Sequence, residues 1–325
     1  MKVTVLGAGA WGTALAKLLH EGRHQVTLWG HDPEHLQALR SGRNERYLPG
    51  ITLPLDWNLE PDLARASTGR DCLIVAVPSK AFRSVTKNLF DYTGLVVSVT
   101  KGIEYDTGLT MCGVLRTTIP KSVSVTLSGP TFALEVARGI PSAIVAASDN
   151  PAAAETVQKL FHRPAFRVYT SADFLGVELG GALKNVIAIA TGVGDGMDFG
   201  DNSKAALITR AIVETRRLGV ACGAQADTFA GLSGMGDLMV TCFSKLSRNR
   251  GFGERLGRGE KAEAIVASMV AVAEGYPTAR SAHELARKRK VVTPIIDEVY
   301  AMLYEGKDVR KAVQDLTARE SKAED

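Results

Sequence analysis

The sequence has few of the residues that build covalent or metal-bound frameworks. It contains four cysteines and six histidines among 325 residues, with no C-x-x-C pair and no histidine at ligand spacing. Neither a disulfide framework nor a metal site is therefore predicted. It also lacks an apolar run of about 18 residues and a signal peptide before its first predicted strand, so we expect a cytoplasmic protein without membrane insertion.

Charge of one sign is also not in excess. Lys and Arg number 39 against 35 Asp and Glu, which gives a net charge of +4. Such a small excess argues against a nucleic-acid partner and leaves room for a basic pocket that binds a small anion. With 45% hydrophobic and 23% charged residues, the composition is that of a soluble globular protein with a large core and space for two domains.

The first twenty residues carry the most informative pattern. Residues 2–6 are a β-rich apolar run, apolar residues recur at helical intervals from residue 13, and Gly7, Gly9 and Gly12 between them make the spacing G-x-G-x-x-G. Gly7 suits a sharp turn, Gly9 a close approach of pyrophosphate to the first helical amides, and Gly12 tight packing of helix on strand. The pattern predicts dinucleotide binding, and a tight β-α turn without a ligand is the alternative.

Further β-rich runs predict a Rossmann-type α/β fold, with a doubly wound, mostly parallel sheet. Continuous apolar runs ended by small, polar or special residues are typical of strands buried on both faces. The carboxyl ends of such strands line the ligand crevice, which places Lys101 and the turn from Gly129 to Ala133 beside a cofactor. The runs are residues 25–29, 71–78, 95–100, 122–127, 143–147 and 166–170, with a helix at 151–161.

The residues after the second strand bear on the choice of dinucleotide. A carboxylate at this position, such as Asp32, binds the ribose hydroxyls of NAD, whereas cationic side chains accommodate the 2′-phosphate of NADP. His31, with Arg43 and Arg46 nearby, favours NADP. Either His31 or Asp32 could instead cap the helix that Pro33 begins. The sequence leaves the choice between NAD and NADP open.

From about residue 172 the β-rich runs stop and helical periodicity takes over. We therefore expect residues 1–172 to form an NAD(P)-binding domain and residues 173–325 an all-α substrate domain. The tail from residue 318 is expected to be frayed. Helices are predicted at residues 173–192, 203–218, 227–229, 248–257, 261–272, 278–288, 294–304 and 308–317.

Lys184 is the candidate acid in the predicted helix at residues 173–192. Its side chain leans over Gly180 and Gly181, and paired glycines inside a helix suggest that another backbone or a ligand comes close there. A positioned ammonium can polarise a ketone oxygen and deliver a proton to it as hydride arrives. The alternative is a surface lysine on a glycine-packed helix, and Asn185 beside it does not decide.

Two further groups of polar residues follow. Asp237 and Thr241 lie one turn apart after a glycine-rich loop, where Asp237 could hold a lysine ammonium or cap a helix. Ser247, Arg248, Asn249 and Arg250 then form a cluster of donors suited to a phosphate. A charged helix start exposed to solvent is the alternative for this cluster.

Taken in order, these motifs closely resemble the bacterial NAD(P)-dependent glycerol-3-phosphate dehydrogenase family. The similarity covers nearly the whole chain, and GALKN and SRNR are not shared by Rossmann enzymes in general. Related β-hydroxyacid dehydrogenases carry an asparagine three or four residues after their lysine, where this chain has Ile187 and Ala188. The motifs are GAGAWGTALA, LWGHDPEH, VAVPS, VTKGIE, SGPTFALE, GGALKNVIAIATG, GLSGMGDLMVTC, SRNRGFGERLG and VAEGY.

The resemblance implies reversible reduction of dihydroxyacetone phosphate to sn-glycerol 3-phosphate, a phospholipid precursor, with NAD or NADP, and it is compatible with a homodimer. It assigns proton transfer to Lys184, with Asp237 beside it. Many members carry serine where Thr131 stands, and some at Ala10. Substrate-binding positions fall on Lys101, Gly129, Thr131, Lys184, Asp237, Thr241, Ser247, Arg248 and Asn249. Cofactor positions of the family fall on Trp11, His31, Lys101, Ala133, Arg248, Val272 and Glu274, and the glycine loop and the end of the second strand add Gly7, Gly9, Ala10, Gly12 and Asp32 to the expected set.

Two other functions fit the same sequence features. One is a ketopantoate or hydroxyisobutyrate type of reductase, which acts on a carboxylate substrate. The other is a noncatalytic NAD(P)-sensing module, which has no need of Lys184, Asp237 and Arg248 together.

Overall fold

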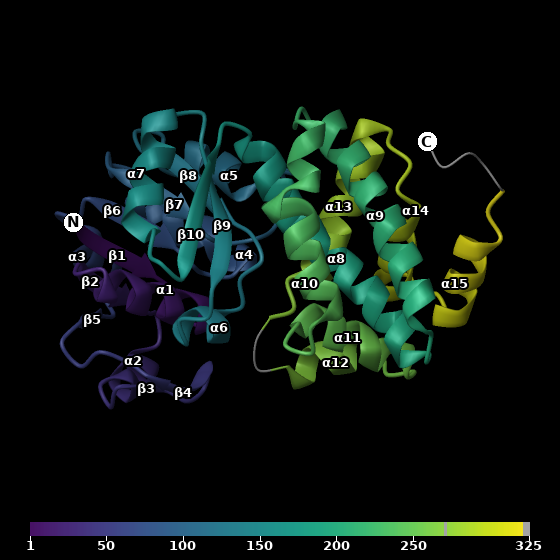
Figure 1. The fold of residues 1–325 in the computed structure, drawn as a ribbon, viewed down its shortest axis with the longest axis horizontal. Helices are drawn as coiled ribbons and strands as arrows, with labels where there is room; N and C mark the ends of the chain where they lie inside the picture. Colours follow the sequence, from purple (N-terminus) through teal and green to yellow (C-terminus); the bar gives the residue numbers. More distant parts are fainter. Residues whose placement is uncertain (270–271, 321–325) are drawn as a thin grey trace.

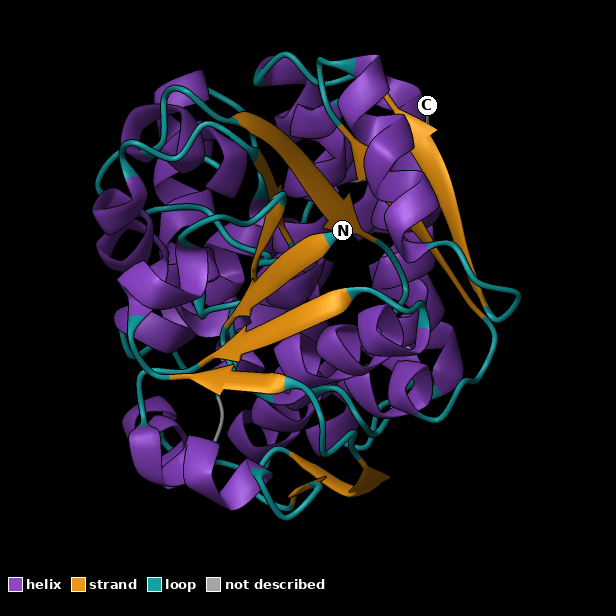
Figure 2. Ribbon diagram, turned by 90° about the vertical axis from the view of Figure 1, so that its left-hand side faces the viewer, coloured by secondary structure: helices purple, strands orange, loops and turns teal. Residues whose placement is uncertain are grey.

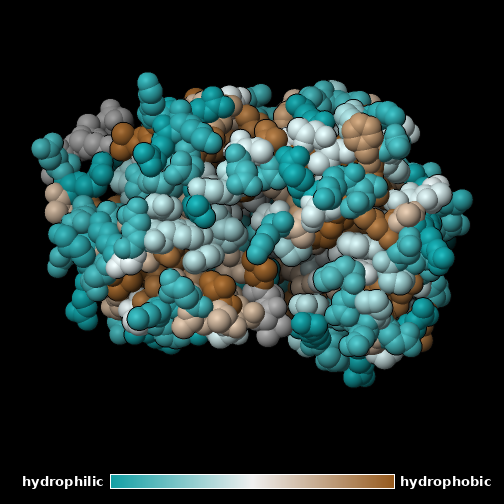
Figure 3. All heavy atoms as spheres, turned by 180° about the vertical axis from the view of Figure 1, so that it is seen from behind, coloured by the Kyte–Doolittle hydropathy of each residue, from teal (hydrophilic) through white to brown (hydrophobic). Residues whose placement is uncertain are grey.

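The computed structural model describes residues 1–269 and 272–320. A part built around a β-sheet carries the N-terminus, and a bundle of helices lies beside it (Figure 1). Seen from behind, the surface of both parts is mostly hydrophilic with scattered apolar patches (Figure 3). This arrangement confirms the predicted fold class, a Rossmann-type sheet followed by an all-helical region.

The sheet has eight strands in the order β10-β9-β8-β7-β6-β1-β2-β5. All neighbours pair in parallel except β8 and β9, which are antiparallel. Its central strand β1 pairs with β2 on one side and β6 on the other, which is the reversal point of a doubly wound sheet. The strands are β1 (Lys2–Leu6), β2 (Gln25–Trp29), β5 (Asn58–Glu60), β6 (Cys72–Val75), β7 (Leu95–Ser98), β8 (Val123–Ser128), β9 (Ser142–Ala147) and β10 (Phe166–Ser171).

Helices pack on the sheet (Figure 2), and the interior strands β1, β6 and β7 are buried on both faces. Successive residues of a strand point to opposite faces, and here they enter different apolar clusters: Val5 and Ile74 join one, Leu6 and Val75 the other. Both faces are therefore dry, as the continuous apolar runs predicted. The helices of this part are α1 (Ala10–Glu21), α2 (Pro33–Leu39), α3 (Leu63–Ser67), α4 (Ser79–Thr86), α5 (Met111–Thr118), α6 (Ala133–Ala137) and α7 (Pro151–Phe161).

The helical part is organised around α8 (Phe174–Gly196). This helix is long and apolar enough to cross a membrane by length and composition, contrary to the expectation of no such run, but 83% of its apolar window is buried inside the protein. It is therefore a core helix, and the remaining helices of this part pack on it or on its neighbours. These are α9 (Asp201–Ala221), α10 (Asp237–Phe243), α11 (Arg248–Gly257), α12 (Ala262–Ser268), α13 (Gly275–Arg289), α14 (Pro294–Tyr304) and α15 (Val309–Thr317), with short turns at Ala226–Ala230 and Leu232–Gly236.

Four glycines bring α8 and α11 into backbone contact. A Cβ atom on Gly192 would lie 2.0 Å from the carbonyl oxygen of Arg250, and one on Gly196 would lie 2.2 Å from that of Glu254. On the facing helix, Cβ atoms on Gly253 and Gly257 would lie 2.0 and 2.4 Å from carbonyl oxygens of α8. No larger residue fits at these four positions without moving the helices apart.

The structure differs from the sequence predictions mainly in short elements. A hairpin of β3 (Arg43–Asn44) and β4 (Leu48–Thr52), the edge strand β5 and helices α3 to α6 were not predicted. The helix predicted at 261–272 ends at Ser268, and residues 270–271 of that prediction lie outside the described residues. Residues 321–325 of the tail also lie outside them.

Candidate functional site

The glycine loop joins β1 to α1 as its spacing predicted. Gly7 has φ +123°, and a Cβ there would lie 2.7 Å from the carbonyl oxygen of Ala76. A Cβ on Gly12 would lie 1.9 Å from the carbonyl oxygen of Gly7, whereas one on Gly9 would meet nothing within 4 Å. Gly7 and Gly12 are thus required by the protein's own packing, and Gly9 leaves open space at the first amides of α1, where an anion is favoured.

Beyond β2, the carboxylate of Asp32 caps α2. It accepts hydrogen bonds from the backbone N–H groups of Glu34 and His35, both at 3.1 Å, and lies 3.7 Å from the Arg46 guanidinium. These hydrogen bonds to the charged form lower the pKa of Asp32. His31 is exposed beside it. Asp32 therefore caps α2, which is one of the roles that the sequence left open for it.

Lys184 is buried in the middle of α8, and its ammonium contacts two side chains of α10. Its Nζ lies 2.7 Å from Oδ1 of Asp237 and 2.6 Å from Oγ1 of Thr241. Lys184 is 9% exposed and Asp237 1%. Lys184 is therefore not a surface group, and Asp237 holds a lysine instead of capping α10 with its side chain.

A second lysine shares the same carboxylate. Lys101, just beyond β7, places its Nζ 2.5 Å from Oδ2 of Asp237 and 3.1 Å from the carbonyl oxygen of Gly129. Burial lowers the pKa of Lys184 to about 8; Asp237 opposes this shift, and the positive charge of Lys101 adds to it. Burial, with Lys101 acting in the same direction, thus brings the pKa of Lys184 to about 8, which suits proton transfer.

The glycine pair beside Lys184 admits close neighbours from two directions. A Cβ on Gly180 would lie 2.8 Å from the carbonyl oxygen of Ser233. A Cβ on Gly181 would lie 2.4 Å from Oγ of Ser128 and 3.5 Å from the Lys101 side chain. The approach predicted from these glycines is therefore made by protein backbone on one side and by Lys101 with Ser128 on the other.

Arg248, the first residue of α11, has a guanidinium with no hydrogen-bond or ion-pair partner among residues 1–269 and 272–320. Part of the Arg248 side chain is accessible to solvent, and the rest is surrounded by protein atoms. This partial burial lowers the pKa of Arg248, and the nearby carboxylate of Glu274 opposes the shift. Glu274 itself accepts hydrogen bonds from the N–H (3.1 Å) and Oγ (2.5 Å) of Ser79 at the start of α4. Burial raises the pKa of Glu274. The two hydrogen bonds from Ser79 and the positive charge of Arg248 oppose this rise.

The other three residues of the predicted donor cluster point elsewhere. Ser247 caps α11 by accepting from the N–H of Arg250 at 3.2 Å. Asn249 bridges two helices, donating to Oδ1 of Asn185 at 2.8 Å and accepting from the N–H of Gly275 at 2.9 Å. Arg250 turns away to an ion pair with Asp195 at 2.6 Å. Arg248 is thus the member of the cluster whose charge is left for a ligand.

The remaining predicted positions lie around these groups. Thr131 donates to the carbonyl oxygen of Gly129 at 3.2 Å, and Ala133 begins the short α6. Ala10 and Trp11 open α1, where both are partly buried, and Val272 is 46% exposed. Within the described residues no group of three or more His, Cys, Asp or Glu could hold a metal ion, and the four cysteines are free.

Sequence reasoning did not single out Ser79, the hydrogen-bond partner of Glu274. Ser79 follows Pro78 beyond the carboxyl end of β6, and that position in a parallel sheet could have marked it. Lys101 and the turn from Gly129 were predicted to lie beside a cofactor because both follow strand ends, and the structure brings the Lys101 ammonium to the carbonyl oxygen of Gly129.

Comparisons with known proteins agree with this geometry. Residues 2–154 match the model of the NAD-dependent glycerol-3-phosphate dehydrogenase N-terminus, and residues 173–314 match that of its C-terminus. The chain is 47% identical to glycerol-3-phosphate dehydrogenase [NAD(P)+] of Syntrophotalea carbinolica over 100% of this chain and 99% of that one. It is 48% identical to the Geobacter sulfurreducens protein of the same name over 99% and 98%. The crystal structure of the Coxiella burnetii glycerol-3-phosphate dehydrogenase aligns with a TM-score of 0.94 at 36% identity, covering 98% of this chain and 99% of that one.

Proposed function

Because this chain belongs to the NAD-dependent glycerol-3-phosphate dehydrogenase family, we propose that Lys184 is the proton donor and acceptor of its reaction. The chain is an NAD(P)-dependent oxidoreductase that reduces dihydroxyacetone phosphate reversibly to sn-glycerol 3-phosphate. The observation that carries the assignment is the buried carboxylate of Asp237 held between the Nζ atoms of Lys184 and Lys101.

In the reductive direction Lys184 acts as an acid. Its ammonium polarises the ketone oxygen and gives that oxygen a proton, which leaves a neutral amine. Asp237 and Thr241 fix the direction of the ammonium through contacts of 2.7 and 2.6 Å. In the oxidative direction the neutral amine takes the proton back, and a pKa of about 8 makes both forms accessible near neutral pH.

The substrate phosphate binds at the start of α11. Arg248 offers a planar fork of donors that has no other hydrogen-bond partner within the described part of the chain, and a guanidinium fork fits phosphate. Ser247 and Asn249 support it by fixing the first turn of α11 through their hydrogen bonds. Lys101, Gly129 and Thr131 complete the substrate-binding set on the sheet side.

The open space at Gly9 fits the pyrophosphate of NAD or NADP, with Gly7, Ala10, Trp11, Gly12, His31, Asp32, Lys101, Ala133, Arg248, Val272 and Glu274 as the residues that hold the rest of the dinucleotide. The first amides of α1 supply hydrogen-bond donors to the pyrophosphate. When bound, the dihydronicotinamide supplies the hydride. The chain's own residues supply orientation and the proton.

The remaining proposals concern organisation. Residues 1–172 form the NAD(P)-binding domain and residues 173–325 the substrate domain. The enzyme acts in the cytoplasm, without membrane insertion, as a homodimer, and its product feeds glycerophospholipid synthesis. The match of two separate family models to the two parts supports the division.

Steady-state kinetics with both cofactors test the function. We expect NADH or NADPH consumption with dihydroxyacetone phosphate and none with 2-ketopantoate. Turnover of 2-ketopantoate alone would instead identify a reductase for carboxylate substrates. Tight cofactor binding with no turnover of any phosphorylated ketone would leave only a sensing module.

A further inference from the structure

Residues 101–105, here called the connecting segment, run from the end of β7 between the sheet part and the helical part. Lys101 contacts Asp237 of α10, and Ile103, 4% exposed, packs within the apolar core of the helical part. The Tyr105 ring lies under the guanidinium of Arg280 on α13, 3.9 Å from ring centroid to Cζ. Three residues of the segment thus touch the helical part.

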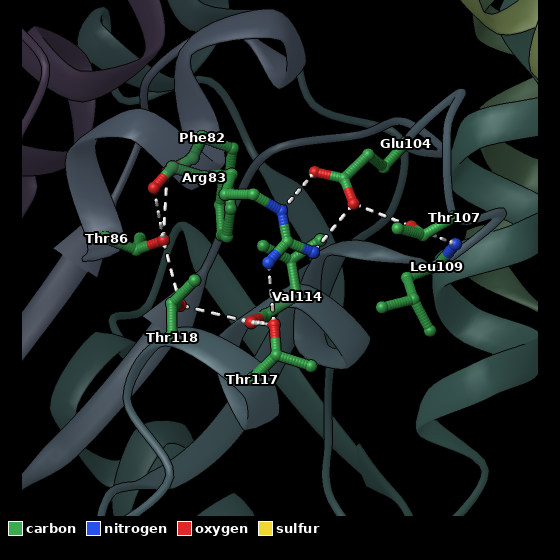
Figure 4. A network of polar contacts seen from close by, with 9 residues as sticks. All are labelled: Phe82, Arg83, Thr86, Glu104, Thr107, Leu109, Val114, Thr117 and Thr118. Carbon is green, nitrogen blue, oxygen red and sulfur yellow. Dashed lines mark hydrogen bonds and ion pairs between the residues drawn. The ribbon is translucent and has the colours of Figure 1, made fainter. Parts of the chain in front are cut away.

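Glu104 ties the same segment to the sheet part, as Figure 4 shows. Its two carboxylate oxygens accept from Nε and Nη2 of Arg83 on α4, both at 2.7 Å. Thr107 donates to the same carboxylate at 2.6 Å, and Arg83 Nη1 donates to Thr117 of α5 at 2.9 Å. This is a two-point fork with a braced partner on each side, so it fixes direction as well as distance.

The backbone between Lys101 and Glu104 has little room to move. A Cβ on Gly102 would lie 2.7 Å from Cβ of Ser79, so the segment presses on the start of α4 four residues before Arg83. Only two residues, Gly102 and Ile103, separate Lys101 from Glu104. The backbone position of Lys101 is therefore set by α4, while its ammonium reaches Asp237 on α10.

We propose that the Arg83–Glu104 pair is a positioning device that holds the Lys101 ammonium against Asp237 and so beside Lys184. The inference rests on the proposed function only in giving Lys184 its chemical role. Arg83 and Glu104 act through Lys101 and touch neither Lys184 nor Asp237. Without the fork the connecting segment keeps its packing on Ser79 but loses its hydrogen bonds to α4, and Lys101 moves away from the shared carboxylate.

The pH dependence of turnover distinguishes this role from a general structural one. The charged or titratable groups that face Lys184 are Asp237 and Cys242 of α10 and Lys101 of the connecting segment. Lys101 lowers the pKa of Lys184, so its retreat raises that pKa. Direct loss of a negative charge at position 104 acts the other way, because a nearby anion favours the ammonium. The sign of the shift therefore separates repositioning from simple removal of charge.

The test is Glu104→Gln, with kcat measured across pH in the direction of ketone reduction. We expect the alkaline limb to move to higher pH and kcat/KM to fall about 10- to 100-fold, the size of a small misplacement in a catalytic site. The pair is partly exposed, with 37% of the Arg83 side chain and 18% of the Glu104 side chain accessible, and Gln keeps the size of Glu, so the variant should fold with a small loss of Tm. Arg83→Lys keeps the charge without the fork and should shift the limb in the same direction, to a smaller extent.

Glu260→Gln is the matched control, because Glu260 makes a similar fork with Arg255 at the far end of α11. It should leave both the pH profile and kcat unchanged. A Glu104→Gln profile that is unchanged or moved to lower pH overturns the proposal.

A crystal structure of Glu104→Gln decides the matter without turnover. Loss of the contact between Lys101 Nζ and Asp237 Oδ2 supports positioning, and its retention overturns it. Should the wild-type protein fail to reduce dihydroxyacetone phosphate, the proposed function fails while this structural comparison still judges the role of Arg83 and Glu104.

Discussion

Lys184 and Asp237 meet at 2.7 Å although they lie 53 positions apart in the sequence. Their contact joins α8 to α10, and the second oxygen of the same carboxylate takes Lys101 from the sheet part. One buried anion therefore gathers two cations from both parts of the molecule. The geometry ties the protonation of Lys184 to the closeness of the two parts.

Replacing Asp237 with Asn should lower the pKa of Lys184, since Asp237 is the group that raises it. The alkaline fall in ketone reduction then moves to lower pH, opposite to the shift expected for Glu104→Gln. Leaving the buried Lys184 ammonium and the partly buried Lys101 ammonium without their anion should also cost about 3 kcal/mol of stability. A pH–rate profile and a thermal melt measure both effects, and an unmoved profile would contradict the assigned role.

Lys184→Met removes the acid but keeps an apolar stem of similar length. Turnover should fall by about 10³-fold, within the range for loss of a positioned acid, while NADH binding stays unchanged. Fluorescence titration of NADH checks the binding. Lys121→Met, which removes an exposed lysine paired with Asp91, is the control and should retain full activity. Substantial turnover in Lys184→Met would refute the proton-transfer role.

Arg248 and Arg250 should respond differently to truncation. Arg248→Ala should raise the KM for dihydroxyacetone phosphate about 10- to 100-fold, the loss of a charge-assisted contact, with little change in Tm. Arg250→Ala should instead destabilise the fold by about 1 to 3 kcal/mol, because it removes one of the two largely buried cations that pair with Asp195, the other being Lys204. Normal saturation by substrate in Arg248→Ala would remove this residue from the phosphate site.

The glycine loop offers a pair of variants with opposite outcomes. A methyl group on Gly9 enters open space, so Gly9→Ala should fold normally and raise the KM for NAD(P)H about tenfold by blocking the close approach of pyrophosphate. A methyl group on Gly12 meets the Gly7 carbonyl at 1.9 Å, so Gly12→Ala should lose about 3 kcal/mol. Cofactor titrations and melts distinguish the two, and equal destabilisation would argue against the assignment of Gly9.

Glu214 should make stability depend on pH. This buried carboxylate of α9 accepts from the N–H groups of Ile295 and Ile296, and burial raises its pKa to about 7 against an ordinary value of 4.5. The folded state therefore binds the proton more tightly, so this contribution to stability is full below pH 4.5 and is lost as pH rises through about 7. Melts of wild type and Glu214→Gln from pH 5 to 8 should show a smaller pH dependence in the variant; equal slopes would contradict it.

The sequence predicted the features that depend on local pattern. The glycine loop, seven of the strands and the core helix around Lys184 followed from spacing and apolar runs. The short hairpin β3–β4 and edge strand β5 escaped, because two to five residues carry no readable alternation. These short strands form because they pair with other strands, β5 with β2 and β3 with β4.

The candidate site was predicted in its residues more than in their partners. Ser247, Arg248, Asn249 and Arg250 look like one cluster in sequence, but successive residues of a helix point about 100° apart. The structure accordingly sends Arg250 to Asp195 and Asn249 to Asn185. The Arg83–Glu104 fork was invisible, because a pairing across 21 residues depends on how α4 packs beside the segment after β7.

The interlocked glycines of α8 and α11 have a consequence for which molecules can react. Lys184 lies on α8 and Arg248 on α11, so the distance between the two helix axes sets the distance between the proposed acid and the proposed phosphate-binding residue. Since the backbones already touch at Gly192 and Gly253, the distance between the two helices cannot decrease, and a methyl group added at either glycine increases it. The glycines between α8 and α11 would thus set the length of substrate that the enzyme accepts, although they do not touch the substrate.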